Sequence, residues 1–197
     1  MSTQKKTHRL TVTAMLSAVA CALMYLELPL PFLIPPFVKL DISDLPELLA
    51  AFSLGPLFGA LVSLLKNLLY MLLHGTTSVG VGELCNFLFG VVFSVTAGSI
   101  YWLRKNRRSA FLGAILGALS MALASLPLNF YLIYPFYAKV YLPMDNIIAA
   151  YQAILPSVRS LWDCLLIFNF PFTFFKGLLD TLICILIYKP LSPILHR

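Results

Sequence analysis

The residues best suited to chemistry are polar and ionisable side chains that interrupt very apolar sequence. Residues 39–47 hold four of the chain's 22 charged residues, namely Lys39, Asp41, Asp44 and Glu47. Lys176 lies near the middle of the last apolar segment. Ionisable groups at membrane depth are costly, so they mark ligand sites, ion pathways or internal ion pairs. The chemistry expected here is hydrogen bonding and charge pairing around a bound solute.

No pattern typical of catalysis accompanies these groups. The histidines His8, His74 and His196 are scattered at the ends of apolar segments, which predicts neither a metal site nor a catalytic triad. No Gly-rich stretch ends in Gly-Lys-Ser or Gly-Lys-Thr, the phosphate-binding motif. The four cysteines lie in separate apolar runs, which favours packed free thiols. We expect a protein that is not an enzyme and that has no cofactor and no metal.

The composition indicates an integral membrane protein. Hydrophobic residues make up 60% of the chain and charged residues 11%, whereas soluble domains are usually about 45–50% apolar. The net charge of +6 is spread over the ends of apolar runs. That distribution is typical of topology signals and does not favour nucleic-acid binding.

The apolar runs predict an all-α fold of six transmembrane helices. The run at residues 45–73 would be about 43 Å long as one helix, whereas a bilayer core needs about 30 Å. It should therefore break at Gly55-Pro56. The first run resembles a signal peptide but has no cleavage site, so we keep it as a helix. The expected spans are residues 10–26, 45–54, 57–73, 83–103, 110–136 and 162–188.

Basic clusters orient these helices. Lysine and arginine concentrate at residues 5–9, at residues 104–108 and at the C-terminus. Six crossings place all three clusters on the cytoplasmic side, as the positive-inside rule requires. We predict one domain, residues 1–197, with both termini cytoplasmic. Its expected segments outside the bilayer are a cytoplasmic tail at 1–9, an extracellular loop at 28–44, a cytoplasmic loop at 104–109 and an extracellular loop with a short surface helix at 138–162.

Two interpretations fit each polar residue in these spans. Lys176 either pairs with Asp180 one turn later or faces a ligand. Lys66 is expected to have a structural ion-pair partner, for which Asp180 is the candidate. Glu83 either caps its helix or, with Asn86 on the same face, contacts a ligand.

Two further patterns have an ordinary and a functional interpretation. The aromatic residues around Tyr134, which follow Asn129, form either an interfacial belt or a stacking surface for a planar ligand. Ala14, Ala18 and Ala22 recur at intervals of four. They either form a stripe for close helix packing or reflect how common alanine is in helices.

Together, these segments resemble the riboflavin-specific substrate-binding subunit (S-component) of energy-coupling-factor transporters. The resemblance extends over residues 10–195. The matching pieces are residues 39–46, Gly55-Pro56 with Lys66-Asn67, Gly82-Glu83 with Asn86-Phe87, residues 129–137, and residues 171–177.

The resemblance implies a six-helix bundle in the cell membrane that captures riboflavin from outside. Together with a transmembrane coupling subunit and two ATP-binding subunits, it would transport the vitamin into the cell. The alanine stripe then becomes the contact with the coupling subunit. Asn129 and Lys176 match flavin-binding positions, whereas Thr173 stands where an asparagine is expected. The expected ligand-binding set is Leu40, Asp41, Thr77, Glu83, Asn86, Asn129, Tyr134, Thr173 and Lys176.

Other functions share parts of this pattern. An S-component for another vitamin, such as folate, thiamine or pantothenate, would have the same fold and the same alanine stripe. An autonomous carrier would transport its solute without ATPase partners.

Overall fold

Helices form most of this computed structural model, which describes residues 3–76 and 78–195. Helix α1 (Thr3–Met24) is followed by loop 1, residues 25–44, in which β1 (Leu28–Pro29) pairs antiparallel with β2 (Lys39–Leu40). The next helices are α2 (Leu45–Ser53), α3 (Pro56–His74), α4 (Val81–Leu103) and α5 (Arg107–Leu128). The remaining elements are η1 (Asn129–Ile133), α6 (Tyr134–Val140), α7 (Met144–Gln152), α8 (Leu161–Cys164), η2 (Leu165–Asn169) and α9 (Phe170–Leu195).

Five helical segments of the described chain are long and apolar enough to cross a membrane. They cover residues 6–24, 56–74, 81–103, 107–140 and 161–188. The helical membrane fold predicted from the sequence is therefore confirmed. The predicted crossing at residues 45–54 corresponds to α2, whose nine residues are fewer than the roughly 20 that a bilayer requires. Six crossings therefore stay a prediction.

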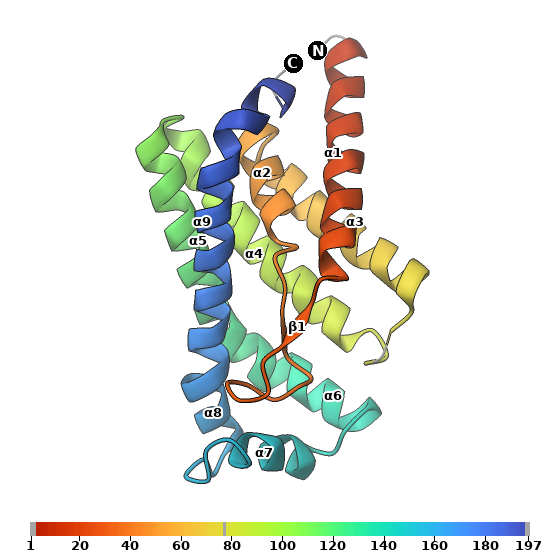
Figure 1. The fold of residues 1–197 in the computed structure, drawn as a ribbon, viewed down its shortest axis with the longest axis vertical. Coiled ribbons are helices and arrows are strands. Elements are labelled where there is room, and N and C mark those ends of the chain that lie inside the picture. The colour runs from red at the N-terminus through yellow and green to blue at the C-terminus, as the bar shows by residue number, and fades with distance from the viewer. Residues whose placement is uncertain (1–2, 77, 196–197) are drawn as a thin grey trace.

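The predicted break in the long apolar run is confirmed at Gly55-Pro56. Gly55 has a φ of 124°, which side-chain-bearing residues rarely adopt, and Pro56 is the first residue of α3. The turn brings α2 back along α3. Helix α2 also packs against α1, α4 and α9, and its residues 45–52 are all buried. The short helix is thus the centre of the bundle (Figure 1).

Helices α4 and α5 approach closely because α5 has glycine where the two backbones meet. A Cβ on Gly113 would lie 2.7 Å from the carbonyl oxygen of Ala97, and one on Gly117 would lie 2.8 Å from that of Phe93. The two glycines are four residues apart, as in small-residue packing motifs of membrane helices. A larger side chain at either position would push the helices apart.

The two π-helical segments, η1 and η2, share one cause. Pro135 and Pro171 each follow a π-helical segment after one intervening residue. Proline has no amide hydrogen and its ring crowds the carbonyl four residues earlier, which here belongs to Tyr131 or Ile167. The wider π-turn accommodates that carbonyl and keeps the helix continuous. Each π-segment has an asparagine at one end, Asn129 or Asn169.

The two ends of the bundle differ. Both termini and the α4–α5 turn lie at one end, whereas loop 1, α6 and α7 lie at the other (Figure 1). The surface helix expected within residues 138–162 is α7, and it buries Ile147 and Tyr151 completely. Helices α1 and α5 begin earlier than their apolar runs, at Thr3 and Arg107, because lysine and arginine are good helix formers.

Candidate ligand-binding site

A cavity of about 850 Å³ is bordered by loop 1 and by the helices next to it. Its volume is typical of small-molecule sites, and its walls come from loop 1, α3, α4, η1, α6, η2 and α9. The aromatic lining residues are Phe37, Tyr70, Phe89, Tyr134, Tyr137, Tyr141 and Phe172. The polar and charged ones include Glu27, Lys39, Asp41, Asp44, Ser78, Glu83, Asn86, Asn129, Asn169, Thr173 and Lys176.

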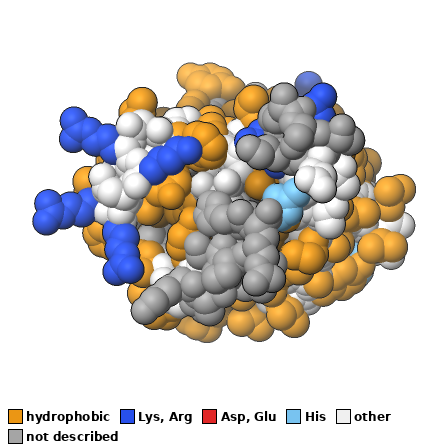
Figure 2. Space-filling model, turned by 90° about the horizontal axis from the view of Figure 1, so that it is seen from above, with side chains coloured by type: hydrophobic (Ala, Val, Ile, Leu, Met, Phe, Trp, Pro, Cys, Tyr) orange, Lys and Arg blue, Asp and Glu red, His pale blue; other side chains and the backbone are white. Residues whose placement is uncertain are grey.

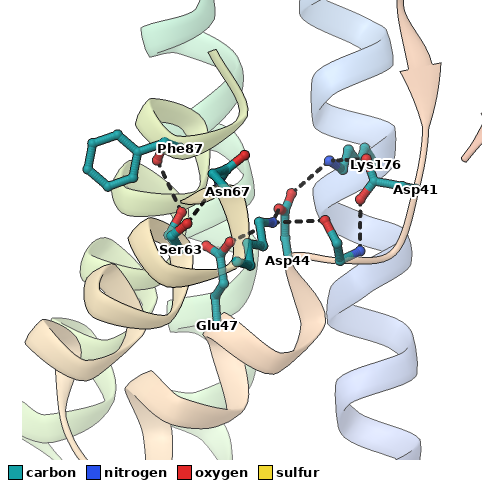
Figure 3. Close-up of polar contacts among 9 residues, drawn as sticks. Asp41, Asp44, Glu47, Ser63, Asn67, Phe87 and Lys176 are labelled. Carbon is teal, nitrogen blue, oxygen red and sulfur yellow. Dashed lines mark hydrogen bonds and ion pairs between the residues drawn. The ribbon is translucent and has the colours of Figure 1, made fainter. Parts of the chain in front are cut away.

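A row of alternating charges, here called the ion-pair ladder, runs from the bundle interior to the cavity (Figure 3). Lys66 Nζ lies 2.6 Å from Glu47 Oε1 and 2.5 Å from Asp44 Oδ1. Lys176 Nζ lies 3.0 Å from the other oxygen of Asp44 and 3.1 Å from Asp41 Oδ2. The Lys66 side chain is fully enclosed, whereas that of Lys176 is 13% exposed at the cavity. Asp44 thus links a structural lysine to a cavity lysine.

The end of loop 1 is shaped to place these carboxylates. The amide of Ser43 donates to Asp41 Oδ1 at 2.8 Å, an Asx turn that directs the chain into α2. The Ser43 hydroxyl accepts from Lys66 Nζ at 2.8 Å. Burial alone would raise the pKa of Asp44, but the ammonium groups of Lys176 and Lys66 outweigh it and lower that pKa to about 2. Asp44 is therefore ionised at neutral pH.

The partners of both lysines differ from those expected along the sequence. The hydrogen-bond and ion-pair partners of Lys176 are Asp41 and Asp44, so the pairing with Asp180 is wrong. Lys66 does have the expected structural role, but with Asp44 and Glu47 in place of Asp180. The reason is that loop 1 and α2 bring three carboxylates, Asp41, Asp44 and Glu47, close to the two ammonium groups. The spacing along α9 alone could not reveal these partners. Asp180 is buried nearby, and its carboxylate oxygens accept no hydrogen bond among the described residues.

Three of the predicted residues are polar lining residues of the cavity. Asn129, Thr173 and Lys176 all line the cavity, and the two uncharged side chains are nearly buried. The Cys85 thiol donates to Asn129 Oδ1 at 3.8 Å. Asn169 lies one turn before Thr173 and lines the same wall, although the sequence did not single it out. Asn169 is the last residue of η2, two residues before Pro171, and a hydropathy profile does not detect such a polar residue at a helix irregularity.

The predicted residues at the start of α4 also reach the cavity. Glu83 is 7% exposed and accepts hydrogen bonds from Thr76 Oγ1 at 3.1 Å and Ser78 Oγ at 3.4 Å. These contacts join Glu83 to side chains of the loop before α4 and not to backbone amides of its helix, so they do not show capping, while its place in the lining keeps the ligand interpretation open. Asn86 lines the cavity too. Thr77 lies outside the described residues.

Loop 1 lines the cavity with one of its two expected residues and with several that were not expected. Asp41 lines the cavity as predicted, whereas Leu40 packs in the apolar cluster of the loop 1 end. Lys39 lines the cavity and pairs with Glu27, so the ion pair joins the two sides of the β1–β2 hairpin. Phe37 stands edge-on to Tyr134 and Tyr151, with ring centres 6.5 and 6.0 Å away.

The aromatic wall is completed by hydrogen bonds behind it. Tyr134, an expected ligand residue, lines the cavity, and its hydroxyl lies 2.5 Å from that of Tyr151. The Tyr151 hydroxyl donates to Asn169 Oδ1 at 2.6 Å, and Asn169 Nδ2 donates to the Tyr134 hydroxyl at 2.9 Å. Burial raises the pKa of Tyr151 well above its ordinary value, so the hydroxyl keeps its proton. Some of the aromatic residues around Tyr134 therefore form part of the cavity wall.

The alanine stripe of α1 faces outward, away from the interior of the bundle. Ala14, Ala18 and Ala22 are all exposed, while Val12, Leu16 and Ala20 on the other side of α1 are buried. The stripe is thus a free helix face in this chain. Its role as a contact surface stays a prediction.

The fold and cavity together have the form of a membrane-embedded solute-binding subunit. Residues 8–188 match the family described as "ECF transporter, substrate-specific component". This chain belongs to that family of energy-coupling-factor transporter subunits, and the resemblance inferred from the sequence is confirmed. The chain is accordingly a membrane protein related to transport subunits and not to enzymes.

Particular relatives extend this result. The chain is 34% identical over 194 residues to riboflavin transporter RibU of Staphylococcus aureus (strain TCH60), covering 98% of this chain and 95% of the relative. It is 30% identical over 190 residues to riboflavin transporter FmnP of Bacillus subtilis (strain 168), covering 95% and 94%. A solved structure described as the S component of a bacterial ECF transporter superposes with a TM-score of 0.74 at 33% identity, covering 98% of this chain and 99% of that one.

Proposed function

We propose that this chain is the riboflavin-binding subunit of an energy-coupling-factor transporter in the plasma membrane. It captures the vitamin from outside, and a transmembrane coupling subunit and two ATP-binding subunits drive uptake. The observation that carries the proposal is the cavity under loop 1, in a chain whose relatives are named riboflavin transporters.

The chemistry of the cavity suits a flavin. The isoalloxazine ring is planar and weakly polar, so aromatic walls such as Phe37, Tyr134 and Phe172 favour its burial. Its carbonyls and ring nitrogens need a few placed donors, for which Asn129, Thr173 and the Lys176 ammonium are candidates. The hydroxyl-rich ribityl chain then has the polar groups near Glu83 and Asn86 as partners.

Loop 1 serves as the cover of the site in this proposal. Its Asp41 carboxylate is held by Lys176, so the loop and α9 are joined at the cavity wall. The Lys176 ammonium has three hydrogens and two carboxylate partners, which leaves one hydrogen for the ligand. A bound flavin carbonyl can thus be added to the ladder without breaking it.

Purification of the chain from cells, followed by absorption spectroscopy and fluorescence titration, tests the proposal. We expect a yellow protein, or a colourless one that quenches the fluorescence of added riboflavin at a 1:1 ratio. Folate, thiamine and pantothenate serve as competitors and should not displace the flavin. Failure to bind riboflavin, or displacement by one of these vitamins, would contradict the assignment. Uptake by vesicles containing this chain alone would contradict the need for partner subunits.

A further inference from the structure

Three side chains form a closed ring of hydrogen bonds in one wall of the cavity. The Tyr134 and Tyr151 hydroxyls and the Asn169 amide are joined in sequence at 2.5, 2.6 and 2.9 Å, and we call them the Tyr-Tyr-Asn ring. Tyr134 and Asn169 line the cavity, whereas Tyr151 is fully buried behind them. The ring joins α6, α7 and η2, three elements distant in sequence.

The hydrogens of this ring can be counted. Tyr151 donates its one hydroxyl hydrogen to Asn169 Oδ1, and Asn169 Nδ2 donates to the Tyr134 hydroxyl oxygen. The Tyr134 hydroxyl must therefore donate to Tyr151, because that oxygen is its partner in the ring. Turning the amide over reverses the circulation but still consumes both hydroxyl hydrogens. In either sense, what remains for a ligand is one amide N–H and oxygen lone pairs.

We propose that Asn169 is a ligand-binding residue and Tyr151 a positioning residue, so that this wall offers one amide donor beside a Tyr134 oxygen that only accepts. The proposal rests on the proposed function and deepens it. It selects a ligand edge on which a carbonyl stands next to an N–H. The imide portion of a flavin ring, where N3–H lies between two carbonyls, has that arrangement.

The packing around Tyr151 supports a positioning role. Its ring lies against Phe168 and Phe37, with centre distances of 5.3 and 6.0 Å, so the hydroxyl is held by its own surroundings. A free asparagine side chain rotates about its torsions. In either circulation the ring holds the Asn169 amide in place and engages both hydroxyl hydrogens, which reduces the ordering that the ligand must otherwise impose.

The test uses Tyr151→Phe in the full-length chain, with riboflavin and 3-methylriboflavin as ligands. The methylated flavin lacks the N3–H donor, so the wild type should prefer riboflavin. Without the Tyr151 hydroxyl, the Tyr134 hydrogen is free to point into the cavity and the amide is free to turn. We expect the Kd for riboflavin to rise about tenfold and that for the methylated flavin much less, in line with the loss of one or two hydrogen bonds. The preference should therefore shrink.

Tyr131→Phe is the matched control, because it makes the same chemical change on a side chain that is 76% exposed. It should leave both Kd values unchanged. Equal weakening of both flavins in Tyr151→Phe would assign Tyr151 a purely structural role and overturn the proposal, as would an unchanged preference. If the wild type binds neither flavin, the proposed function fails as well, so the two failures are distinguishable.

Discussion

At the residue scale, two lysines in one ladder have separate tasks. Lys66 is enclosed between Asp44 and Glu47, and no part of its side chain is exposed. Lys176 shares Asp44 but is partly exposed at the cavity. A fully enclosed ion pair serves the fold, whereas an ammonium at a cavity wall has a hydrogen to offer. Substitution of each lysine should therefore affect a different property.

Lys176→Ala should weaken riboflavin binding and leave membrane insertion intact. It removes a donor to the ligand and the partner of Asp41, while Asp44 keeps Lys66. A charge-assisted hydrogen bond contributes about 1.5–3 kcal/mol, so Kd should rise about 10- to 100-fold. Calorimetric titration of the purified variant measures this. Lys139→Ala, at an exposed position of α6, is the control, and an unchanged Kd for Lys176→Ala would remove Lys176 from the site.

Lys66→Met should destabilise the protein itself. It leaves the carboxylates of Asp44 and Glu47 buried with one fewer cation, and breaking a buried pair costs about 3–5 kcal/mol. Thermal unfolding in detergent should show a clearly lower midpoint. Adding Glu47→Gln removes the carboxylate that loses its lysine, whereas Asp44 keeps Lys176, and should restore part of the loss. A midpoint equal to that of the wild type would show that the ladder does not stabilise the fold.

The sequence predicted which side chains are unusual better than it predicted their partners. Asp41 and Lys176 were recognisable because ionisable groups interrupt very apolar sequence, and Asn129 and Thr173 because they align with flavin-binding positions of the family that the sequence resembles. All four line the cavity. The hydrogen bond between Lys176 and Asp41 spans 135 positions, so no local spacing reveals it. Asn169 was missed because its hydrogen-bond partners, Tyr134 and Tyr151, lie on other helices, so no local spacing points to it.

At the element scale, the end of α2 could be predicted from the sequence, but its position inside the bundle could not. The break before α3 was predictable because Gly55-Pro56 is a local signal. The central position of α2 was not, since an apolar run looks the same whether lipid or protein surrounds it. Contacts with α1, α3, α4 and α9 place α2 among these four helices. Loop 1 enters this helix directly through Asp44.

The close approach of α4 and α5 gives a prediction at this scale. Gly117→Val should lower the free energy of unfolding by about 1–3 kcal/mol, the usual cost of overpacking. The first added carbon meets the Phe93 carbonyl, a backbone atom that cannot move aside alone. Thermal unfolding in detergent measures the change. Leu116→Val, on the exposed side of the same helix, should have little effect, and equal effects of both would contradict the packing argument.

The exposed face of α1 gives a second prediction. Ala18→Trp should abolish riboflavin uptake in cells while leaving binding to the purified subunit within about twofold, or about 0.4 kcal/mol. Small residues allow a partner helix to approach closely, and an indole prevents that approach without touching the cavity. Leu112→Trp, on the exposed face of α5, is the control and should transport normally. Uptake by Ala18→Trp at the wild-type rate would refute the contact role of the stripe.

At the scale of the whole molecule, the basic cluster of the α4–α5 turn and the loop 1 side of the cavity lie at opposite ends. Lysine and arginine side chains project from the end that carries both termini, and no acidic side chain appears there among the residues drawn in colour (Figure 2). Arg104, Lys105, Arg107 and Arg108 are all exposed at the α4–α5 turn. Loop 1, which contributes residues to the cavity lining, lies at the other end (Figure 1). This polarity supports an outward-facing cavity and cytoplasmic termini, as the positive-inside rule predicts.

Labelling of single cysteines in intact cells tests that orientation. In a background with Cys21, Cys85, Cys164 and Cys184 replaced by alanine, Asp145→Cys in α7 should react with a membrane-impermeant maleimide. Arg107→Cys should react only after the membrane is permeabilised. Riboflavin binding by both variants serves as the control for folding. Labelling of Arg107→Cys in intact cells, with Asp145→Cys protected, would place the cavity on the cytoplasmic side, and a subunit in that orientation has no access to vitamin outside the cell.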